Sequence, residues 1–283
     1  MHTEVIATSW EHLHAELFGM FEDPRYVAAG INRHRTPFVF RGLAHVDYRL
    51  TTSLQRLNQC ETVDARLGSI EKKLLFGFRM YSQRDPDPNF SNWYWLSLAQ
   101  HHGLPTRLMD WTWSPYVALH FATADVTESN FGDAVVWCIN MTEVQHFLPS
   151  DLQGILHEVI YNGFYAELMD KVASDLDQFD ALSDDPFLVF FEPPSLDARI
   201  VNQGGLFSVL SSPSGKPDLP LDSWLMERRT PERPLFRKVI IPASLKWEVR
   251  DKLDGANINE RMLFPGLDGV SAWLKRHYSC GPP

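Results

Sequence analysis

The chain has 283 residues, 44% of them hydrophobic and 12% aromatic, which is enough apolar material for one large or two small domains. Its formal net charge of −10 makes it a poor general binder of phosphate backbones, so a nucleic-acid partner is not favoured. No apolar run reaches the roughly 18 residues of a membrane span, and the N-terminal stretch lacks the pattern of a signal peptide. We therefore expect a cytoplasmic protein without a membrane partner.

Hydrophobic spacing and turn residues predict the elements of the first half of the chain. In chain order these are a helix at about 9–22, a strand at 36–42, a helix at about 61–83, a helix at 91–102, an extended piece through Asp110, and a helix from 115. Ser91 is the expected cap of the fourth element and Gly103 its left-handed terminator. Ser114 caps the last helix, with Pro115 in its first turn.

The second half is predicted to be rich in strands. The β-rich runs are 134–140, 187–193, 199–210 and 235–242, and a helix at about 243–253 follows, ending at Gly255. Residues 150–186 have helical spacing and end in the acidic run "DLDQFDALSDDP", expected to be a solvated helix end and loop.

The alternation of strands and helices is irregular, which predicts a mixed α+β fold of mainly antiparallel small sheets flanked by helices. We expect a helical lead-in at 1–35 and one domain at 36–275 with a helical insertion near 150–186. Cys60, Cys138 and Cys280 are too far apart in sequence for a disulfide framework or a metal-binding pair.

Two stretches of the first half carry residues suited to anion binding. Arg41 ends a predicted strand beside Gly42, where a backbone can approach closely, and its planar guanidinium suits phosphate or carboxylate. A structural ion pair is an equally good interpretation. Ser53 and Arg56 follow in "RLTTSLQR", where capping of the next helix is the favoured role for Ser53.

The stretch "AQHHGLPTRLMDWTWSPYVALHFA", residues 99–122, holds an unusual concentration of polar residues between large apolar ones. One of His101 and His102 is expected to be a core or supporting residue, and the other to face a cleft. Arg107 and Asp110 are three apart in an extended piece, so each needs its own partner. A metal site at these histidines and Asp110 lacks the usual ligand spacing, and no metal is expected.

The same stretch and a later one are expected to line that cleft. Trp113 stands between Thr112 and Ser114, and an aromatic ring beside hydroxyls suits a ring-containing ligand. Farther along, the paired glycines after Gln203 break a predicted strand, which places the Gln203 side chain at the break.

Four stretches in this order resemble the FRG domain, a bacterial and phage family named for its Phe-Arg-Gly triplet. They are "FRG" at 40–42, residues 99–122, "RIVNQGGLF" at 199–207 and "LFPGLDG" at 263–269. The resemblance spans about 36–275. It implies a toxin or phage-defence effector, since family members often lie beside such genes.

"FRG", "DWTWSPYVALHFA" and "RIVNQGGLFSV" also resemble, more weakly, the elements of ADP-ribosyltransferases of the Arg–Ser–Glu type. This second resemblance implies an ADP-ribosyltransferase-like core that takes NAD as substrate. In it Arg41 holds the dinucleotide phosphates, Thr112 orders the strand beside the nicotinamide ribose, and Asp110 stands at the first serine of the family. Gln203 is nearest to the catalytic glutamate.

Because Gln203 is neutral, Glu192 or Glu260 is a possible source of the missing negative charge, or the site binds without reacting. The expected catalytic residues are therefore Arg41, Thr112, Gln203 and Asp110. The expected NAD contacts are Arg41, Gly42, Ser53, Arg56, His101, His102, Thr106, Arg107 and Trp113.

Three functions follow as alternatives. The first is an effector that hydrolyses NAD or transfers ADP-ribose to a macromolecular target, with an antitoxin or sensor protein as a possible partner. The second is a non-catalytic module that binds a nucleotide or protein in the same cleft. The third is a metal-dependent nuclease using His101, His102 and Asp110, which the composition disfavours.

Overall fold

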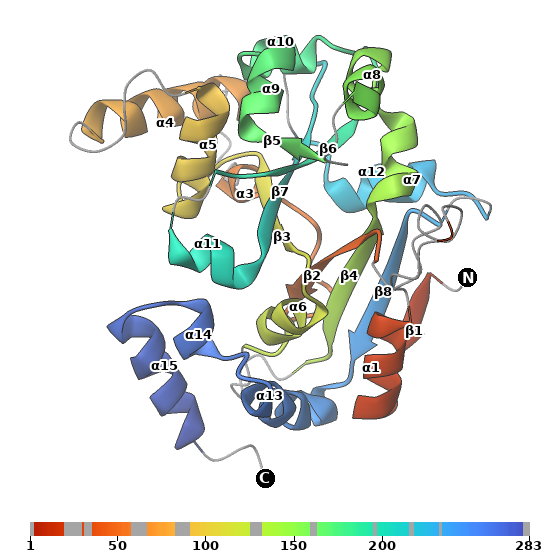
Figure 1. Ribbon diagram of the computed structural model, residues 1–283, viewed down its shortest axis with the longest axis vertical. Helices are drawn as coiled ribbons and strands as arrows, with labels where there is room; N and C mark the ends of the chain where they lie inside the picture. The colour runs from red at the N-terminus through yellow and green to blue at the C-terminus, as the bar shows by residue number, and fades with distance from the viewer. Residues whose placement is uncertain are drawn as a thin grey trace.

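A computed structural model describes most of the chain (Figure 1). The described residues are 3–19, 30, 36–57, 67–82, 91–124, 132–158, 163–194, 197–214, 218–231 and 234–279. Cys60 and Cys280 lie outside them, and so does the end of the helix predicted at 9–22. Cys138 is buried and free, and burial raises the pKa of its thiol. Within these ranges no helix combines the length and apolarity needed to span a membrane.

Eight strands form one mixed sheet in the order β1-β8-β4-β2-β3-β7-β6-β5. The strands are β1 Glu4–Ile6, β2 Phe38–Leu43, β3 Leu108–Thr112, β4 Ala134–Asn140, β5 Phe164–Tyr165, β6 Leu188–Glu192, β7 Gly205–Leu210 and β8 Phe236–Ile241. Only the outermost pairs, β1–β8 and β5–β6, are parallel. The predicted mixed α+β class is confirmed; the ADP-ribosyltransferase-like core and the domain boundaries stay predictions.

Helices cover both faces of this sheet (Figure 1). The α-helices are α1 Trp10–Phe18, α3 Ser53–Leu57, α4 Leu67–Tyr81, α5 Asn92–His101, α6 Pro115–Ala122, α7 Met141–Val144, α8 Ser150–Glu158, α9 Ala166–Val172, α10 Leu176–Asp180, α11 Ala198–Gln203, α12 Leu221–Arg228, α13 Lys246–Gly255, α14 Glu260–Leu263 and α15 Leu267–His277. Two 3₁₀ turns, η2 Gln145–Phe147 and η3 Ala243–Leu245, complete the described elements.

The sheet consists of two four-stranded halves that meet between β2 and β3. Those two strands share a single residue pair, Phe40 with Thr112, whereas β2 pairs with β4 over six residues. The prediction of several small sheets is therefore wrong, because all the strands among the described residues belong to one sheet. The near-break in the middle is the feature that positions the site described below.

Each half has its own core on the shared face of the sheet. Around β2, β4 and β8 this core is supplied by α1, α6 and α13, and around β6 and β7 by α5, α9 and α10. Side chains alternate between faces along a strand, so Trp111 and Trp137 join a third core on the opposite face, with Trp224 of α12. The shared face is left uncovered at the junction of the halves.

Helix α6 lies directly against β2 at Gly42. A Cβ added at Gly42 would lie 1.9 Å from the carbonyl oxygen of Ala118 and 2.6 Å from the backbone nitrogen of Ala122. The glycine of the Phe-Arg-Gly triplet is therefore required for this contact between the two backbones. The sequence-based expectation of a close backbone approach here is confirmed, although the partner is helix α6.

The strand predicted at 199–210 is wrong in its first half. Residues 198–203 form helix α11, which Asp197 caps by accepting hydrogen bonds from the backbone N–H groups of Arg199 and Ile200 at 2.8 and 3.1 Å. Gly204 ends the helix in the left-handed conformation with φ 53°, and β7 begins at the next residue.

The acidic run at 175–186 is not entirely solvated either. Asp175 caps α10, and Asp180 is buried with its carboxylate against the Arg107 guanidinium. The apolar positions around Asp180 bury one side of α10 against β6, which brings this carboxylate inward.

We expect Gly42→Ala to lower the free energy of unfolding by about 1–3 kcal/mol, because the methyl group would overlap the α6 backbone. Urea denaturation measures this loss. Gly154→Ala on the exposed side of α8 is the matched control, and it should leave stability unchanged or raise it by up to about 1 kcal/mol. Equal stability of the Gly42 variant and the wild type would contradict the close contact.

Candidate functional site

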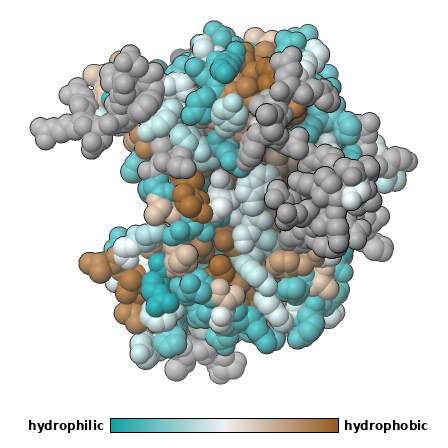
Figure 2. Space-filling model, viewed as in Figure 1, coloured by the Kyte–Doolittle hydropathy of each residue, from teal (hydrophilic) through white to brown (hydrophobic). Residues whose placement is uncertain are grey.

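A cleft of about 800 Å³ opens at the junction of the two sheet halves. Its walls come from β2, β3, β7, α5, α6 and α11, and Figure 2 shows the molecular outline notched between the surface over α11 and that over α14 and α15. The polar and aromatic lining residues are Phe40, Arg41, Tyr48, Ser53, Gln100, His101, His102, Asp110, Trp111, Thr112, Phe121, Arg199, Gln203 and Phe207. The volume lies within the range of small-molecule sites.

Arg41 is the mostly buried cation of this cleft, with 21% of its side chain exposed. Its Nη1 donates to the backbone oxygen of Asp110 at 2.5 Å and lies 3.9 Å from the Asp110 carboxylate. Its Nε is buried without a hydrogen-bond partner among the described residues. Burial lowers the pKa of Arg41, an effect that Asp110 offsets and the Arg56 charge reinforces. The guanidinium stays charged with donors to spare.

A chain of hydrogen bonds orients Asp110. The Thr106 hydroxyl donates to Oε1 of Gln100 at 2.6 Å, and Nε2 of Gln100 donates to Oδ2 of Asp110 at 2.9 Å. Ser53 links to the backbone of Thr106. Gln100 thus orients the carboxylate of Asp110, which lines the cleft with 62% of its side chain exposed.

The two histidines differ in their surroundings. His101 is 11% exposed, and its Nε2 lies 2.7 Å from Oδ2 of Asp197. His102 is exposed at the end of α5, and its backbone N–H donates to Leu98. Both line the cleft and neither belongs to a core cluster, so the part of the expectation that placed one histidine in the core is not met.

Thr112 and Gln203 meet at the floor of the cleft. The Thr112 hydroxyl donates to the backbone oxygen of Gln203 at 2.6 Å and accepts from the backbone N–H of Ser114 at 3.0 Å. Nε2 of Gln203 donates to the backbone oxygen of Leu263 at 3.0 Å. Gln203 ends α11 instead of lying on a strand, and its amide attaches that helix to α14.

Four predicted NAD contacts lie outside the cleft lining. Arg107 is buried in an ion pair with Glu71 at 2.7 Å and Asp180 at 2.8 Å, on the opposite side of β3 from Asp110. Thr106 is buried beneath Gln100, the Trp113 ring is exposed, and Arg56 binds the backbone oxygen of Thr51. The expectation that Arg107 and Asp110 each have a separate partner is confirmed.

Ser53 does not act as the cap predicted for it. Thr52 accepts the hydrogen bond from the backbone N–H of Gln55, while the Ser53 hydroxyl bonds Thr106 across to β3. Ser53 nevertheless lines the cleft, together with Gly42.

Glu260, one of the proposed substitute carboxylates, is engaged elsewhere. It forms ion pairs with Arg250 and with Arg276, the second at 2.8 Å, and these arginines hold its pKa at about 2 despite its burial. Arg250 also donates to Nδ1 of His120 at 3.0 Å. This cluster fixes α13, α14 and α15 to α6. Neither Glu260 nor Glu192 is part of the cleft lining.

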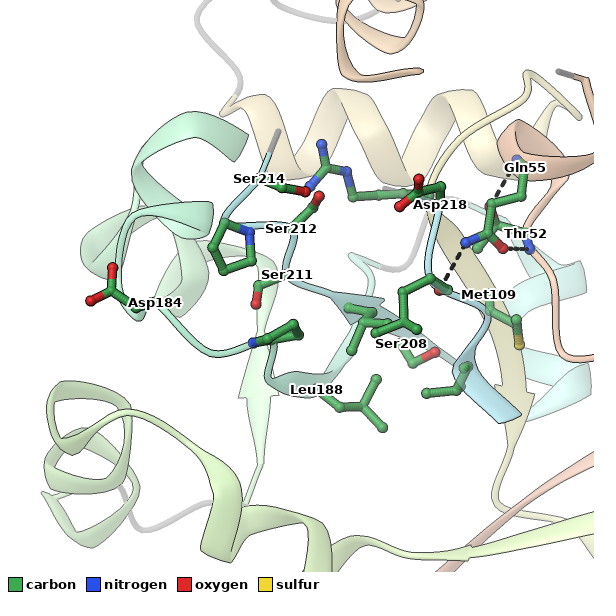
Figure 3. A pocket seen from close by; sticks show the side chains of 16 residues that line it. Thr52, Gln55, Met109, Asp184, Leu188, Ser208, Ser211, Ser212, Ser214 and Asp218 are labelled. Atoms are coloured by element: carbon green, nitrogen blue, oxygen red, sulfur yellow. Dashed lines mark hydrogen bonds between the residues drawn. The ribbon is translucent and has the colours of Figure 1, made fainter. Parts of the chain in front are cut away.

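A second cavity of about 280 Å³ lies on the other face of the sheet (Figure 3). Met109 and Ser208 line it, and these alternate along their strands with Asp110 and Phe207 of the cleft. Its buried hydroxyls are in use, since Ser208 accepts from Trp111 and Ser211 from the backbone of Phe187. The larger cleft, with its unused cationic donors, is therefore the candidate site.

Sequence reasoning missed Gln100 and Asp197 as site residues. Asp197 stands two residues before the predicted strand, and its value as a helix cap was the available signal. Arg199 was missed with it, because a strand there gave no reason to place that side chain in the cleft. Within the part of the chain that the structure describes, no three or more His, Cys, Asp or Glu residues cluster as metal ligands would.

Residues 36–130 match the family described as the FRG domain, a span that contains β2, α5, β3 and α6. No curated protein and no solved structure matches the chain.

The buried His120 predicts a pH dependence of stability. Burial and the Arg250 charge lower its pKa from 6.5 to about 3. The unfolded chain therefore takes up a proton below pH 6.5 while the fold does not, so stability present above pH 6.5 is lost progressively towards pH 3.

Between pH 7 and pH 5 this group should cost the wild type about 2 kcal/mol of unfolding free energy. His120→Asn, which keeps an acceptor for Arg250, should show a pH slope smaller by that amount in urea denaturation. His146→Asn, at an exposed position, is the matched control and should keep the wild-type slope. Identical slopes in all three proteins would contradict the buried neutral imidazole.

Proposed function

We propose that the chain, whose residues 36–130 match the FRG domain, binds NAD in the cleft at the sheet junction and cleaves the bond between nicotinamide and ribose. The ADP-ribose passes to water or to a macromolecular target. A role as a bacterial toxin or phage-defence effector, with an antitoxin or sensor as partner, belongs to the same proposal and rests on the family resemblance alone.

Arg41 is the observation that carries the proposal. A guanidinium that is four-fifths buried, with one hydrogen bond and an unpartnered Nε, has donors available for a phosphate. Buried polar groups without partners are rare in folded proteins, so the free donor of Arg41 marks a position suited to binding an acceptor. Arg199, which also lines the cleft, and the charge of Arg56 add to a local positive field within an acidic protein.

The rest of the cleft suits the other parts of a dinucleotide. Tyr48, Phe121 and Phe207 provide aromatic surface for planar rings. Asp110 supplies a carboxylate oriented by Gln100, and a negative charge stabilises the cationic character that the ribose gains as nicotinamide leaves. In this proposal Asp110 takes the electrostatic role, because the Gln203 amide is neutral and bound to Leu263.

A second candidate function is binding without reaction. The engagement of Gln203 by α14 favours it, as does the 3.9 Å contact that partly neutralises Asp110. The cleft would then recognise a nucleotide without cleaving it.

The test measures NAD binding by calorimetry and nicotinamide release by chromatography for the wild type and Arg41→Ala. We expect the variant to lose at least tenfold in NAD affinity, since removing a charge-assisted contact costs about 1.5–3 kcal/mol. Arg49→Ala is the matched control, because Arg49 is exposed, pairs with Asp222 and lies outside the cleft.

Binding that Arg41→Ala abolishes, without nicotinamide release by the wild type, would select the non-catalytic alternative. Equal NAD affinity in the wild type and both variants would contradict the proposed site.

A further inference from the structure

His101 and Asp197 form an acid–imidazole pair at the cleft wall, in which 45% of the Asp197 side chain is exposed. They are 96 residues apart in sequence, and the pair joins the end of α5 to the start of α11. Nε2 of His101 lies 2.7 Å from Oδ2 of Asp197, and only 11% of the histidine side chain is exposed.

The Asp197 carboxylate is rigid and ionised. Its Oδ1 accepts from the backbone N–H groups of Arg199 and Ile200, so the side chain is fixed by the first turn of α11. Partial burial acts to raise the pKa of Asp197, but the Ile200 amide and His101 outweigh it and hold this pKa below its ordinary value. An ionised carboxylate accepts only, so the proton between the two groups belongs to Nε2 of His101.

This arrangement leaves Nδ1 of His101 as a proton acceptor. When Nε2 carries the proton of a neutral imidazole, Nδ1 has a free lone pair. No residue that the structure describes forms a hydrogen bond to this atom. His101 lines the same cleft as Arg41 and follows Gln100, which orients Asp110.

We propose that His101 is the general base of this site. The group that it deprotonates is an oxygen nucleophile, which is water when no other acceptor is bound. This inference rests on the proposed function. The nucleophile's oxygen bonds to C1′ of the nicotinamide ribose as the C1′–N1 bond breaks and its electron pair leaves on nicotinamide. The nucleophile's proton moves to Nδ1, and Asp197 stabilises the resulting imidazolium.

The alternative role for the pair is a structural tie between α5 and α11. A tie requires the contact but no basic nitrogen at the cleft. Loss of a tie would weaken NAD binding or stability, and small-molecule imidazole would not restore turnover. Loss of a general base would lower kcat, keep NAD affinity, and be reversed by imidazole.

The experiment measures NAD hydrolysis by the full chain with His101→Ala, His101→Gln and Asp197→Asn, alongside NAD affinity by calorimetry. General bases contribute about 10²–10⁴-fold, so we expect kcat of the His101 variants to fall at least 100-fold. NAD affinity should stay within about threefold. Imidazole should restore part of the activity of His101→Ala. Asp197→Asn keeps the cap of α11, so it tests the charge with the helix intact.

His12→Ala is the matched control, because His12 lies 3.2 Å from Glu16 on α1 and outside the cleft. It should hydrolyse NAD at the wild-type rate. His101 variants that turn over normally, or that lose activity together with NAD affinity and are not rescued by imidazole, would overturn the general-base role and leave the proposed function intact. A wild type that releases no nicotinamide would overturn both.

Discussion

The contact between α6 and β2 at Gly42 sets the geometry on which the rest of the cleft depends. No side chain fits between the Gly42 backbone and Ala118, so the helix lies directly on the strand at the junction of the two sheet halves. The cap of the same helix, Ser114, stands two residues after Thr112, whose pairing with Phe40 joins β2 to β3. Helix, strand and junction are therefore positioned together.

The single bridge has a direct chemical consequence. Beyond Phe40 and Thr112 the two strands no longer pair, which frees the backbone oxygen of Asp110 to accept from Arg41. In a continuous ladder that oxygen would face a neighbouring strand. The polar residues crowded into 99–122 are explained by this opening. Gln100 and Thr106 connect the end of α5 to the exposed carboxylate of Asp110. His101 connects the same end of α5 to α11 through Asp197.

Local signals predicted the elements of this region because their causes are local. Ser91 and Ser114 act as the expected caps, and Gly103 adopts the left-handed conformation with φ 81°. The same chemistry at Asp197 and Gly204 marks α11, yet the β-branched Ile200 and Val201 between them favoured a strand, and the glycine pair was interpreted as a break within it. The two capping residues, seven positions apart, were the better signal, because each satisfies backbone groups that are left without partners at the end of a helix.

Partners distant in sequence lay beyond such reasoning. The sequence indicated that Arg107 and Asp110 needed separate partners, but Glu71 and Asp180 lie 36 and 73 residues from Arg107. The acidic run that contains Asp180 looked like solvated surface, because charge patterning describes an average environment and a buried ion pair is an exception to it.

Arg41 and Arg107 show how structure separates roles that the sequence leaves equal. Arg107 is buried against two carboxylates, and burial of so well matched a cation fixes α4 and α10 to β3. Arg41 has one backbone acceptor and one carboxylate at 3.9 Å, and its Nε has no partner among the described residues. Replacing an arginine whose donors are all paired lowers the stability of the protein. An arginine with unpaired donors can still bind a ligand through them. That difference in satisfied donors is the reason we propose the ligand site on the Arg41 side of β3.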